Sequence, residues 1–382
     1  MNILFVMKHR PNAGNIHAVV DYMRVGQRHG HSFALYGTED PWVPDARFST
    51  NVWAFDRLVY LFESELYRVQ RLREVALLAK FPKRHRLILD MDGMYNPPLV
   101  LDDYDHNHTD EAESLRWIEF CDTLSDRIIK PTLAPSDNPR VSSLIIYGYD
   151  PALQLDPASA PPKQFDILHV GHNWWRWKEV AGELLPAFEQ IRDQVGEIGF
   201  VGLWWDAPPP EGPKAGPDEA LQSDPEAFRQ FGLWWDAPRP EGRKAAPVEA
   251  FQSDPEAFRR LRIHTSTAVM YSDVIRTMST ARINIFTQRP ILRHLKHLTL
   301  KYFEIFYADT IPLLMFDGDH AAAVYGPAGR ELTLAGRVAE KLLDALRRPD
   351  HYRGLVEDVR HHLAAHHSYD RRVEELVAAM RE

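Results

Sequence analysis

Short apolar runs alternate with segments of helical spacing along this chain, and that alternation restricts the folds it can adopt. "NILFVMK" (2–8) is an apolar run of the kind expected for a strand covered on both faces. Further runs follow at 32–37, 56–62, 86–92 and 126–135, with helical segments between them, notably at 64–80 and 110–122. Strands in alternation with helices predict a parallel sheet that carries helices on both faces.

A second alternation begins after a segment without periodicity. The stretch 147–164 is rich in Pro, Ala and Asp, and we expect an interdomain linker over 151–164. "FDILHVGHNWWRWKEV" then predicts a strand and a glycine turn, followed by a helix at 177–193. Later strands are expected at 197–205, 267–271, 281–287 and 310–316, and helices from 331 onwards with a break near 347–354.

The chain length predicts two domains, because 382 residues exceed what one hydrophobic core usually supports. We expect an α/β protein with Rossmann-like domains at 1–150 and 165–350, whose parallel sheets face a central cleft. Residues 351–382 are expected to form a helical segment that packs back on the first domain.

An internal repeat interrupts the second domain. The segment 202–229 recurs almost unchanged at 232–259, which indicates a tandem duplication and not a solenoid. One copy is expected to belong to the fold and the other to form a surface excursion. The paired Trp residues of each copy either pack on the protein or form part of an acceptor or partner surface.

The net charge of −9 argues against a nucleic-acid partner, because no block of Lys and Arg offsets it. The single cysteine, Cys121, allows no internal disulfide, which fits a cytoplasmic protein. The N-terminal "MNILFVMKHRP" predicts a first strand and not a signal peptide. No run approaches the ~20 apolar residues of a membrane span.

Candidate site residues lie where open α/β sheets bind ligands, beyond the carboxyl ends of strands and near helix starts. In "VGHNWWRW" (170–177), backbone N–H groups at Gly171 could hold a phosphate, with Arg176 as a forked cation. In "HLTLKYFE" (297–304), a helix that begins near Thr299 would point its N–H groups at a diphosphate. Glu304 could then accept hydrogen bonds from ribose or sugar hydroxyls. A tight turn, a surface Arg and a solvated Glu are the alternatives.

The loop "HRPNAGNIH" (9–17) follows the first strand and would face the cleft from the other domain. Asn12, Gly14 and Asn15 are candidate acceptor-side residues. His17 could act as a base or bind the acceptor, although a structural His at a helix start is the alternative.

The stretch "STARINIFTQRPILRHLKHLTLKYFEIFYADTIPLLM" (279–315) resembles the signature of GT-B glycosyltransferases. It is most similar to the CgeB and spore-maturation-type group, which is related to glycosyltransferase family 1/4 domains. "FDILHVGHNWWRW" resembles the opening of that group's second domain, and "HHSYDRRVEELV" (366–377) resembles its end motif. The resemblance covers roughly 165–377 apart from the duplication, and is only architectural over 1–150.

The resemblance implies a hexosyltransferase-type enzyme with a nucleotide-sugar donor in the C-terminal domain and no essential metal. Glu304 would bind the donor's ribose. Thr299 and Lys301 would lie at the diphosphate, with Arg176 as its cationic partner. If the reaction inverts the anomeric centre, His17 or Asp92 would be the base.

Three positions depart from the group's pattern. Lys301 stands where Arg is usual and Asp309 where Gly is usual, and Lys296 occupies the first acidic position of an E-x7-E motif. These departures favour an alternative, in which the chain is a catalytically inactive GT-B-like binding or assembly protein.

Other motifs suggest metal chemistry. "RLILDMDGMYN" (86–96) resembles the first motif of haloacid-dehalogenase-type phosphatases, in which Asp90 would be the nucleophile, Asp92 the acid/base and magnesium the cofactor. No convincing lysine station or second acidic pair follows. "DDYDHNHTD" (102–110) and the pair His362 and His366 could bind a metal, but solvated surface residues are the simpler explanation. The favoured function is transfer of a sugar from a nucleotide-diphosphate sugar to an unidentified small molecule, glycan or cell-surface polymer.

Overall fold

The computed structural model describes most of the chain, and every statement below refers to those residues. They are 1–7, 14–41, 43–62, 81–91, 93, 95, 99–101, 105–106, 119, 122–135, 141–206, 252–334 and 336–381. Asn12, Asp92, the predicted helix at 64–80 and residues 207–229 and 232–251 of the duplicated segment lie outside them.

The first sheet has seven strands in the order β3-β2-β1-β4-β5-β8-β9, all in parallel register. Its strands are β1 (Asn2–Val6), β2 (Ser32–Tyr36), β3 (Phe48–Ser49), β4 (Arg57–Phe62), β5 (Arg86–Asp90), β8 (Ile128–Lys130) and β9 (Val141–Ser143). The side chains of β1 alternate between two apolar cores. Ile3 and Phe5 join the core beneath helix α1 (Gly14–Arg28), whereas Leu4 and Val6 join the core on the other face. This two-sided burial explains why the run is apolar at successive positions.

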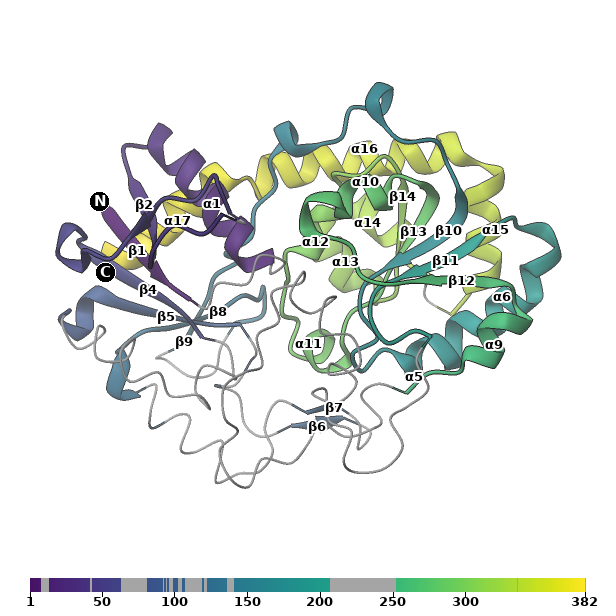
Figure 1. The fold of residues 1–382 in the computed structure, drawn as a ribbon, viewed down its shortest axis with the longest axis horizontal. Coiled ribbons are helices and arrows are strands. Elements are labelled where there is room, and N and C mark those ends of the chain that lie inside the picture. Colours follow the sequence, from purple (N-terminus) through teal and green to yellow (C-terminus); the bar gives the residue numbers. More distant parts are fainter. Residues whose placement is uncertain are drawn as a thin grey trace.

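The second sheet has five parallel strands in the order β12-β11-β10-β13-β14. They are β10 (Phe165–Val170), β11 (Ile198–Val201), β12 (Ile263–Ser266), β13 (Ala281–Phe286) and β14 (Ile311–Leu314). Figure 1 shows the two sheets in separate lobes. The predicted α/β class with two parallel, Rossmann-like sheets is therefore confirmed.

Helices surround the second sheet. They are α5 (Trp177–Glu179), α6 (Leu185–Ile191), α9 (Pro255–Arg260), α10 (Val274–Met278), α11 (Pro290–His294), α12 (Lys301–Glu304), α13 (Gly318–Tyr325), α14 (Pro327–Glu331) and α15 (Val338–Arg347). One predicted strand, 267–271, is wrong: the strand is β12, and the segment after it leads into the 3₁₀ turn η8 (Tyr271–Asp273). Val269 and Tyr271 pack on the core from this loop, which accounts for its apolar character.

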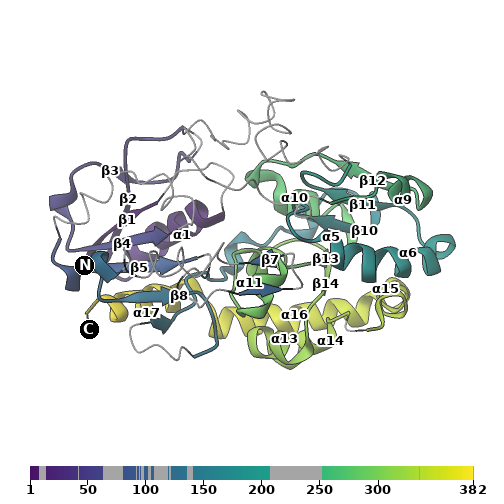
Figure 2. The same cartoon turned by 90° about the horizontal axis from the view of Figure 1, so that it is seen from below.

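The last two helices connect the lobes. Helix α16 (Pro349–His366) lies along the second sheet, and α17 (Tyr369–Arg381) lies beside the first, as Figures 1 and 2 both show. On α17, Asp370 binds Arg28 and His29 at the end of α1, at 3.1 Å and 2.8 Å. The ring of Tyr369 packs edge-on against Tyr22 of α1. No helix in the described part of the chain is long and apolar enough to cross a membrane.

The start of α17 leaves no room for a side chain at Gly148. A Cβ there would lie 2.7 Å from Cγ and 2.8 Å from the backbone nitrogen of Tyr369. Because backbone cannot move aside cheaply, we expect Gly148→Ala to lower the free energy of unfolding by about 1–3 kcal/mol. Urea denaturation measures the loss.

Gly354→Ala is the matched control for this substitution. Gly354 lies inside α16 and a Cβ there would meet nothing within 4 Å, so alanine should stabilise the helix by up to about 1 kcal/mol. Equal effects at the two positions would contradict the steric explanation.

Candidate functional site

Both sheets reverse their strand order beside their first strand. In the second sheet, β10 pairs with β11 on one side and with β13 on the other. The carboxyl ends of β10 and β13 therefore border the crevice where such sheets bind ligands. Helices α11 and α12 follow β13 and lie on the side of this lobe that faces the first sheet (Figure 1).

The turn after β10 is packed against Lys301. The Nζ of Lys301 donates a hydrogen bond to the carbonyl of Val170, the last residue of β10. A Cβ on Gly171 would lie 2.7 Å from that Nζ, so a larger residue at this position would require the end of the Lys301 side chain to shift. Lys301 and Gly171 thus meet as parts of one site.

The amide groups of this turn are largely occupied by the protein itself. Gly171 N–H donates to the carbonyl of Val201 at 2.8 Å, and Asn173 N–H donates to that of Leu203 at 3.0 Å. The expectation that the Gly171 amide is available for a phosphate does not fit this geometry. Arg176 donates from Nη1 to the carbonyl of His172 at 2.7 Å and so holds the turn in place.

Positive charge gathers beside the end of β10. Burial, together with the charge of Arg176, lowers the pKa of Lys301 to about 7, and the charge of Glu304 acts in the opposite direction. His169 is fully buried on β10, where burial and the nearby Lys301 hold its pKa well below the usual value and keep its ring neutral. Its Nδ1 pairs with the carbonyl of Ile285 at 3.0 Å. No sequence pattern singles out His169, because it is one residue among the apolar positions of a buried strand.

Glu304 is a buried carboxylate one turn after Lys301, with only 7% of its surface exposed. Burial raises its pKa, while a hydrogen bond from Tyr271 and the charge of Lys301 lower it. Its Oε1 has no hydrogen-bond partner among the described atoms. A carboxylate oxygen left in this condition is an acceptor ready for a ligand hydroxyl.

Helix α12 begins two residues after the predicted start near Thr299 and is one turn long. It spans Lys301–Glu304, and i→i+3 bonds follow, such as Phe306 N–H to the carbonyl of Phe303. Thr299 lies before the helix, and its carbonyl accepts from Tyr302 N–H. A single turn has little dipole, so the side chain of Lys301, and not the helix end, is the source of positive charge here.

The first lobe meets this region at the start of α1. A Cβ on Gly14 would lie 3.0 Å from Cδ2 of Leu300, directly before α12. Asn15 accepts a hydrogen bond from the hydroxyl of Tyr147. The ring of His17 stacks on Tyr271 with centroids 3.8 Å apart and planes within 11°. The structure thus brings His17 to Glu304 through Tyr271, a residue that the sequence analysis missed.

Asp90, the first aspartate of the phosphatase-like motif, has a structural role. Asp90 is 2% exposed at the end of β5, and its Oδ2 accepts the backbone N–H of Tyr95 at 2.8 Å. The carboxylate therefore stabilises the turn after the strand. Among the residues described, no three His, Cys, Asp or Glu side chains lie together as metal ligands, and Asp92 is not one of those residues. His362 and His366 are neighbours, with ring centroids 4.5 Å apart.

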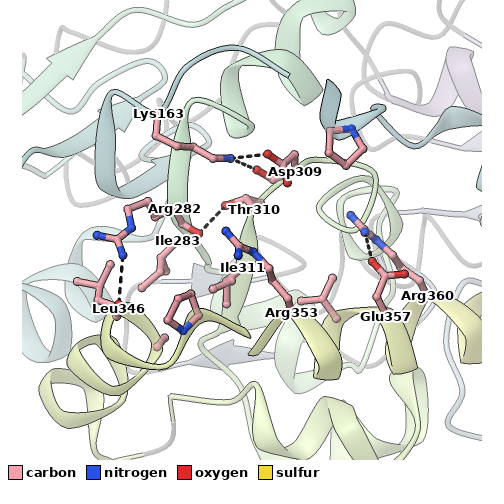
Figure 3. A pocket seen from close by; sticks show the side chains of 14 residues that line it. Lys163, Arg282, Ile283, Asp309, Thr310, Ile311, Leu346, Arg353, Glu357 and Arg360 are labelled. Carbon is pink, nitrogen blue, oxygen red and sulfur yellow. Dashed lines mark hydrogen bonds and ion pairs between the residues drawn. The ribbon is translucent and has the colours of Figure 1, made fainter. Parts of the chain in front are cut away.

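A pocket of about 420 Å³ lies at the opposite ends of β13 and β14, as Figure 3 shows. Its basic side chains are engaged in ion pairs, namely Lys163 with Asp309, Arg282 with Asp166, Arg353 with Asp350, and Arg360 with Glu357. Asp309 pairs with Lys163 at 2.8 Å. Asp309, which stands where glycine is usual in the group that the sequence resembles, therefore lies away from Gly171 and Lys301.

No family model matches the chain, and no curated protein matches its sequence. Solved structures do resemble it over its whole length. One is an α-glucosyltransferase in complex with UDP-glucose and DNA containing an abasic site (TM-score 0.57, 10% identity, 100% of this chain and 99% of that chain). Another is the phage T4 β-glucosyltransferase in complex with UDP and Mn²⁺ (0.52, 10%, 100% and 99%). A third is the sucrose-phosphate synthase of Thermosynechococcus elongatus (0.60, 13%, 100% and 98%).

At these identities the likeness establishes the fold, and the chain has the GT-B architecture that was predicted. The narrower CgeB-type grouping stays a prediction. Two other predictions are wrong. One is the absence of a nucleic-acid partner, which was inferred from the net charge, and the other is the absence of an essential metal, which the resemblance implied.

The exclusion of nucleic acid is overturned, because a glucosyltransferase with this fold is bound to DNA. A net charge averages over the whole surface, so it does not report on a local contact face. The exclusion of a metal is overturned by the complex with UDP and Mn²⁺. Phosphate oxygens are themselves ligands for divalent cations, so a metal can enter such a site with its nucleotide.

Because the pKa of Lys301 is lowered, we expect the free energy of unfolding to depend on pH. Its folded pKa, about 7, lies below the ordinary value of 10.5, so between these values the unfolded chain binds a proton that the folded chain does not. The contribution of Lys301 to stability must therefore rise as pH rises above 7. Relative to Lys301→Met, the natural protein should gain about 1–2 kcal/mol between pH 7 and 9. Urea unfolding at several pH values measures this gain.

Lys301→Arg is the control, because a guanidinium stays protonated throughout this range. It should show no such gain relative to Lys301→Met. A flat difference between the natural protein and Lys301→Met would show that the amine is not buried as the structure has it.

Proposed function

We propose that this protein is a glycosyltransferase that moves a sugar from a nucleotide-diphosphate sugar to a hydroxyl-bearing acceptor. The observation that carries the proposal is the buried Glu304, with one carboxylate oxygen unpartnered, one turn from Lys301 at the order reversal of the second sheet. The GT-B fold supports it, as does the sequence signature over 279–315. That signature also supports membership of the CgeB-type group.

In this proposal Glu304 accepts hydrogen bonds from the two ribose hydroxyls of the donor. A carboxylate matches a diol because its two oxygens can each accept one proton. Burial makes the match selective, because an unpaired hydroxyl or carboxylate in such a place is costly. The nucleoside would thus be recognised through its sugar.

Lys301, Arg176 and Thr299 lie on the diphosphate side of the proposed site. The amine of Lys301 has a pKa of about 7, so a bound diphosphate would draw a proton onto it and meet a full positive charge. Arg176, at the start of α5, adds a second cation close to the turn at Gly171. Fixed charges of this kind stabilise the diphosphate as it leaves the sugar.

The acceptor would approach from the first lobe, past Asn12, Gly14, Asn15 and His17. His17 is the candidate base for an inverting reaction because its ring reaches the Tyr271 side of the site. Asp92, which follows β5, is the second candidate. Small molecules, glycans, cell-surface polymers and DNA are all acceptors to test, the last because of the DNA-bound glucosyltransferase of the same fold.

Binding of nucleotides to Glu304 variants tests the proposal. UDP, GDP, dTDP and ADP are each added with and without Mg²⁺ or Mn²⁺, and the melting temperature is recorded. A nucleotide at 100 times its Kd should stabilise the natural protein by about 2.7 kcal/mol. Glu304→Ala should abolish that shift and Glu304→Gln should reduce it, because the amide keeps the shape of the carboxylate but not its charge.

Glu340→Ala, an exposed change on α15, is the matched control and should leave the nucleotide shift unchanged. An undiminished shift in Glu304→Ala would overturn the site assignment. Nucleotide binding without sugar transfer to any acceptor would favour the alternative of a GT-B-like binding or assembly protein, which the departures at Lys296, Lys301 and Asp309 suggest. Of these, Lys296 is exposed and has a left-handed backbone, where the related motif has an acid.

A further inference from the structure

Tyr271 is the residue that connects the two lobes at the candidate site. It begins the turn η8, between β12 and α10 of the second lobe. One face of its ring is stacked on His17 of α1, from the first lobe. Its hydroxyl hydrogen-bonds to the carboxylate of Glu304. Two proposed functional groups from opposite lobes therefore share one tyrosine.

The groups that face Glu304 explain what this hydroxyl contributes. Lys301 on the same helix supplies a charge, but its amine already donates to the carbonyl of Val170. Tyr271 supplies a direct neutral hydrogen bond, and its hydroxyl in turn lies near Asp21 of α1 and Tyr307. Burial raises the pKa of Tyr271 well above its ordinary value, and the charge of Glu304 and these neighbours add to the effect, so the hydroxyl remains a donor.

We propose that Tyr271 is a positioning residue, which fixes the orientation and charge of Glu304 for donor binding and fixes the imidazole of His17 for the acceptor step. The proposal deepens the function above and rests on Glu304 as the ribose acceptor. The two parts of the Tyr271 side chain have different roles. The hydroxyl acts on donor binding through Glu304, and the ring acts on His17 through stacking.

The hydroxyl of Tyr271 occupies one acceptor position of the Glu304 carboxylate and leaves the others free. An ionised carboxylate has about four acceptor positions, so a single Tyr O–H leaves room for a diol. A hydrogen bond to a charged group is stronger than one to a neutral group, so this bond favours the ionised form of Glu304 over the protonated one. Without it, burial would favour the protonated acid, which is the weaker acceptor for two hydroxyls.

The ring restricts His17 from one side. Rings at 3.8 Å and 11° are in full face-to-face contact, so the imidazole cannot turn about its bonds without losing the contact. Since α1 and η8 belong to different lobes, the same contact also fixes the distance between the acceptor side and the donor side. Precise placement of this kind is what a proton transfer across a cleft requires.

The variants Tyr271→Phe and Tyr271→Leu separate the role of the hydroxyl from the role of the ring. Tyr271→Phe keeps the stacked ring and removes the hydroxyl, so nucleotide affinity at pH 7.5 should fall about tenfold or more. Its affinity should also be lost at a higher pH than in the natural protein, because Glu304 becomes protonated more easily. Tyr271→Leu should show the same losses and, in addition, a lower kcat. Calorimetric titration with the nucleotide identified by the melting panel, between pH 5.5 and 8.5, measures the first two effects.

The state of His17 can be followed without any substrate. In ¹H–¹³C spectra, the ring protons of His17, assigned with a His17→Gln variant, should show the upfield displacement that an aromatic ring directly above them produces. That displacement should persist in Tyr271→Phe and vanish in Tyr271→Leu. Tyr352→Phe is the matched control, because it removes a tyrosine hydroxyl bonded to Asp344 at 2.7 Å on the far side of the lobe. It should change neither readout.

The outcomes distinguish this inference from the function on which it rests. If the natural protein binds no nucleotide, the proposed function fails, while the His17 spectra still decide whether Tyr271 holds that ring. If it binds nucleotide and Tyr271→Phe binds equally well at every pH, the inference is overturned and the function stands. Tighter binding by Tyr271→Phe would also overturn it, because Tyr271 would then be a competitor of the ribose. An equal loss at all pH values would indicate a merely structural residue.

Discussion

The contact between Lys301 and the end of β10 is the constraint on which the candidate site depends. The amine of Lys301 donates to the carbonyl of Val170, and Gly171 presents no Cβ where that amine lies. Helix α12 begins at Lys301, and Glu304 follows one turn later. Burial of the amine brings the pKa of Lys301 close to 7. One contact thus relates packing and charge at the site.

The lobes are joined by contacts that differ in character. Those of α17 with α1 combine partly exposed ion pairs, such as Asp370 with Arg28 and His29, which each contribute little, with the buried packing of Tyr369 on Tyr22. Near the linker, Tyr149 stacks on Tyr307 with centroids 5.0 Å apart, which adds apolar contact between the lobes. At the site, the stack of His17 on Tyr271 is accompanied by backbone contacts, such as the hydrogen bond from Leu298 N–H to the carbonyl of Pro131 at 2.6 Å. The lobes therefore touch along the candidate site as well as behind it.

The sequence could predict the parts of this structure that leave a local pattern. Strands such as β1 and β10 are buried on both faces, so their apolar runs stand out. Strand β12 lies at the edge of its sheet with exposed positions, and its "IHTS" does not stand out, so the prediction moved to the apolar loop after it. Lys301 and Glu304 could be found because they share one motif. Tyr271 could not, because its partners His17 and Glu304 are brought to it by the tertiary fold alone.

Tyrosine suits Glu304 as a partner because the proposed diol site needs free acceptor positions on the carboxylate. A guanidinium would pair with both carboxylate oxygens at once and leave no place for two ligand hydroxyls. A second ammonium would hold Glu304 ionised but would add positive charge beside Lys301, whose amine already loses its proton near neutral pH. A phenol supplies one directed hydrogen bond and no charge, and its ring provides the face on which His17 rests. Because Oε1 of Glu304 has no hydrogen-bond partner in the part of the chain that the structure describes, this arrangement preserves both the acceptor capacity and the charge balance that a nucleotide diphosphate would require.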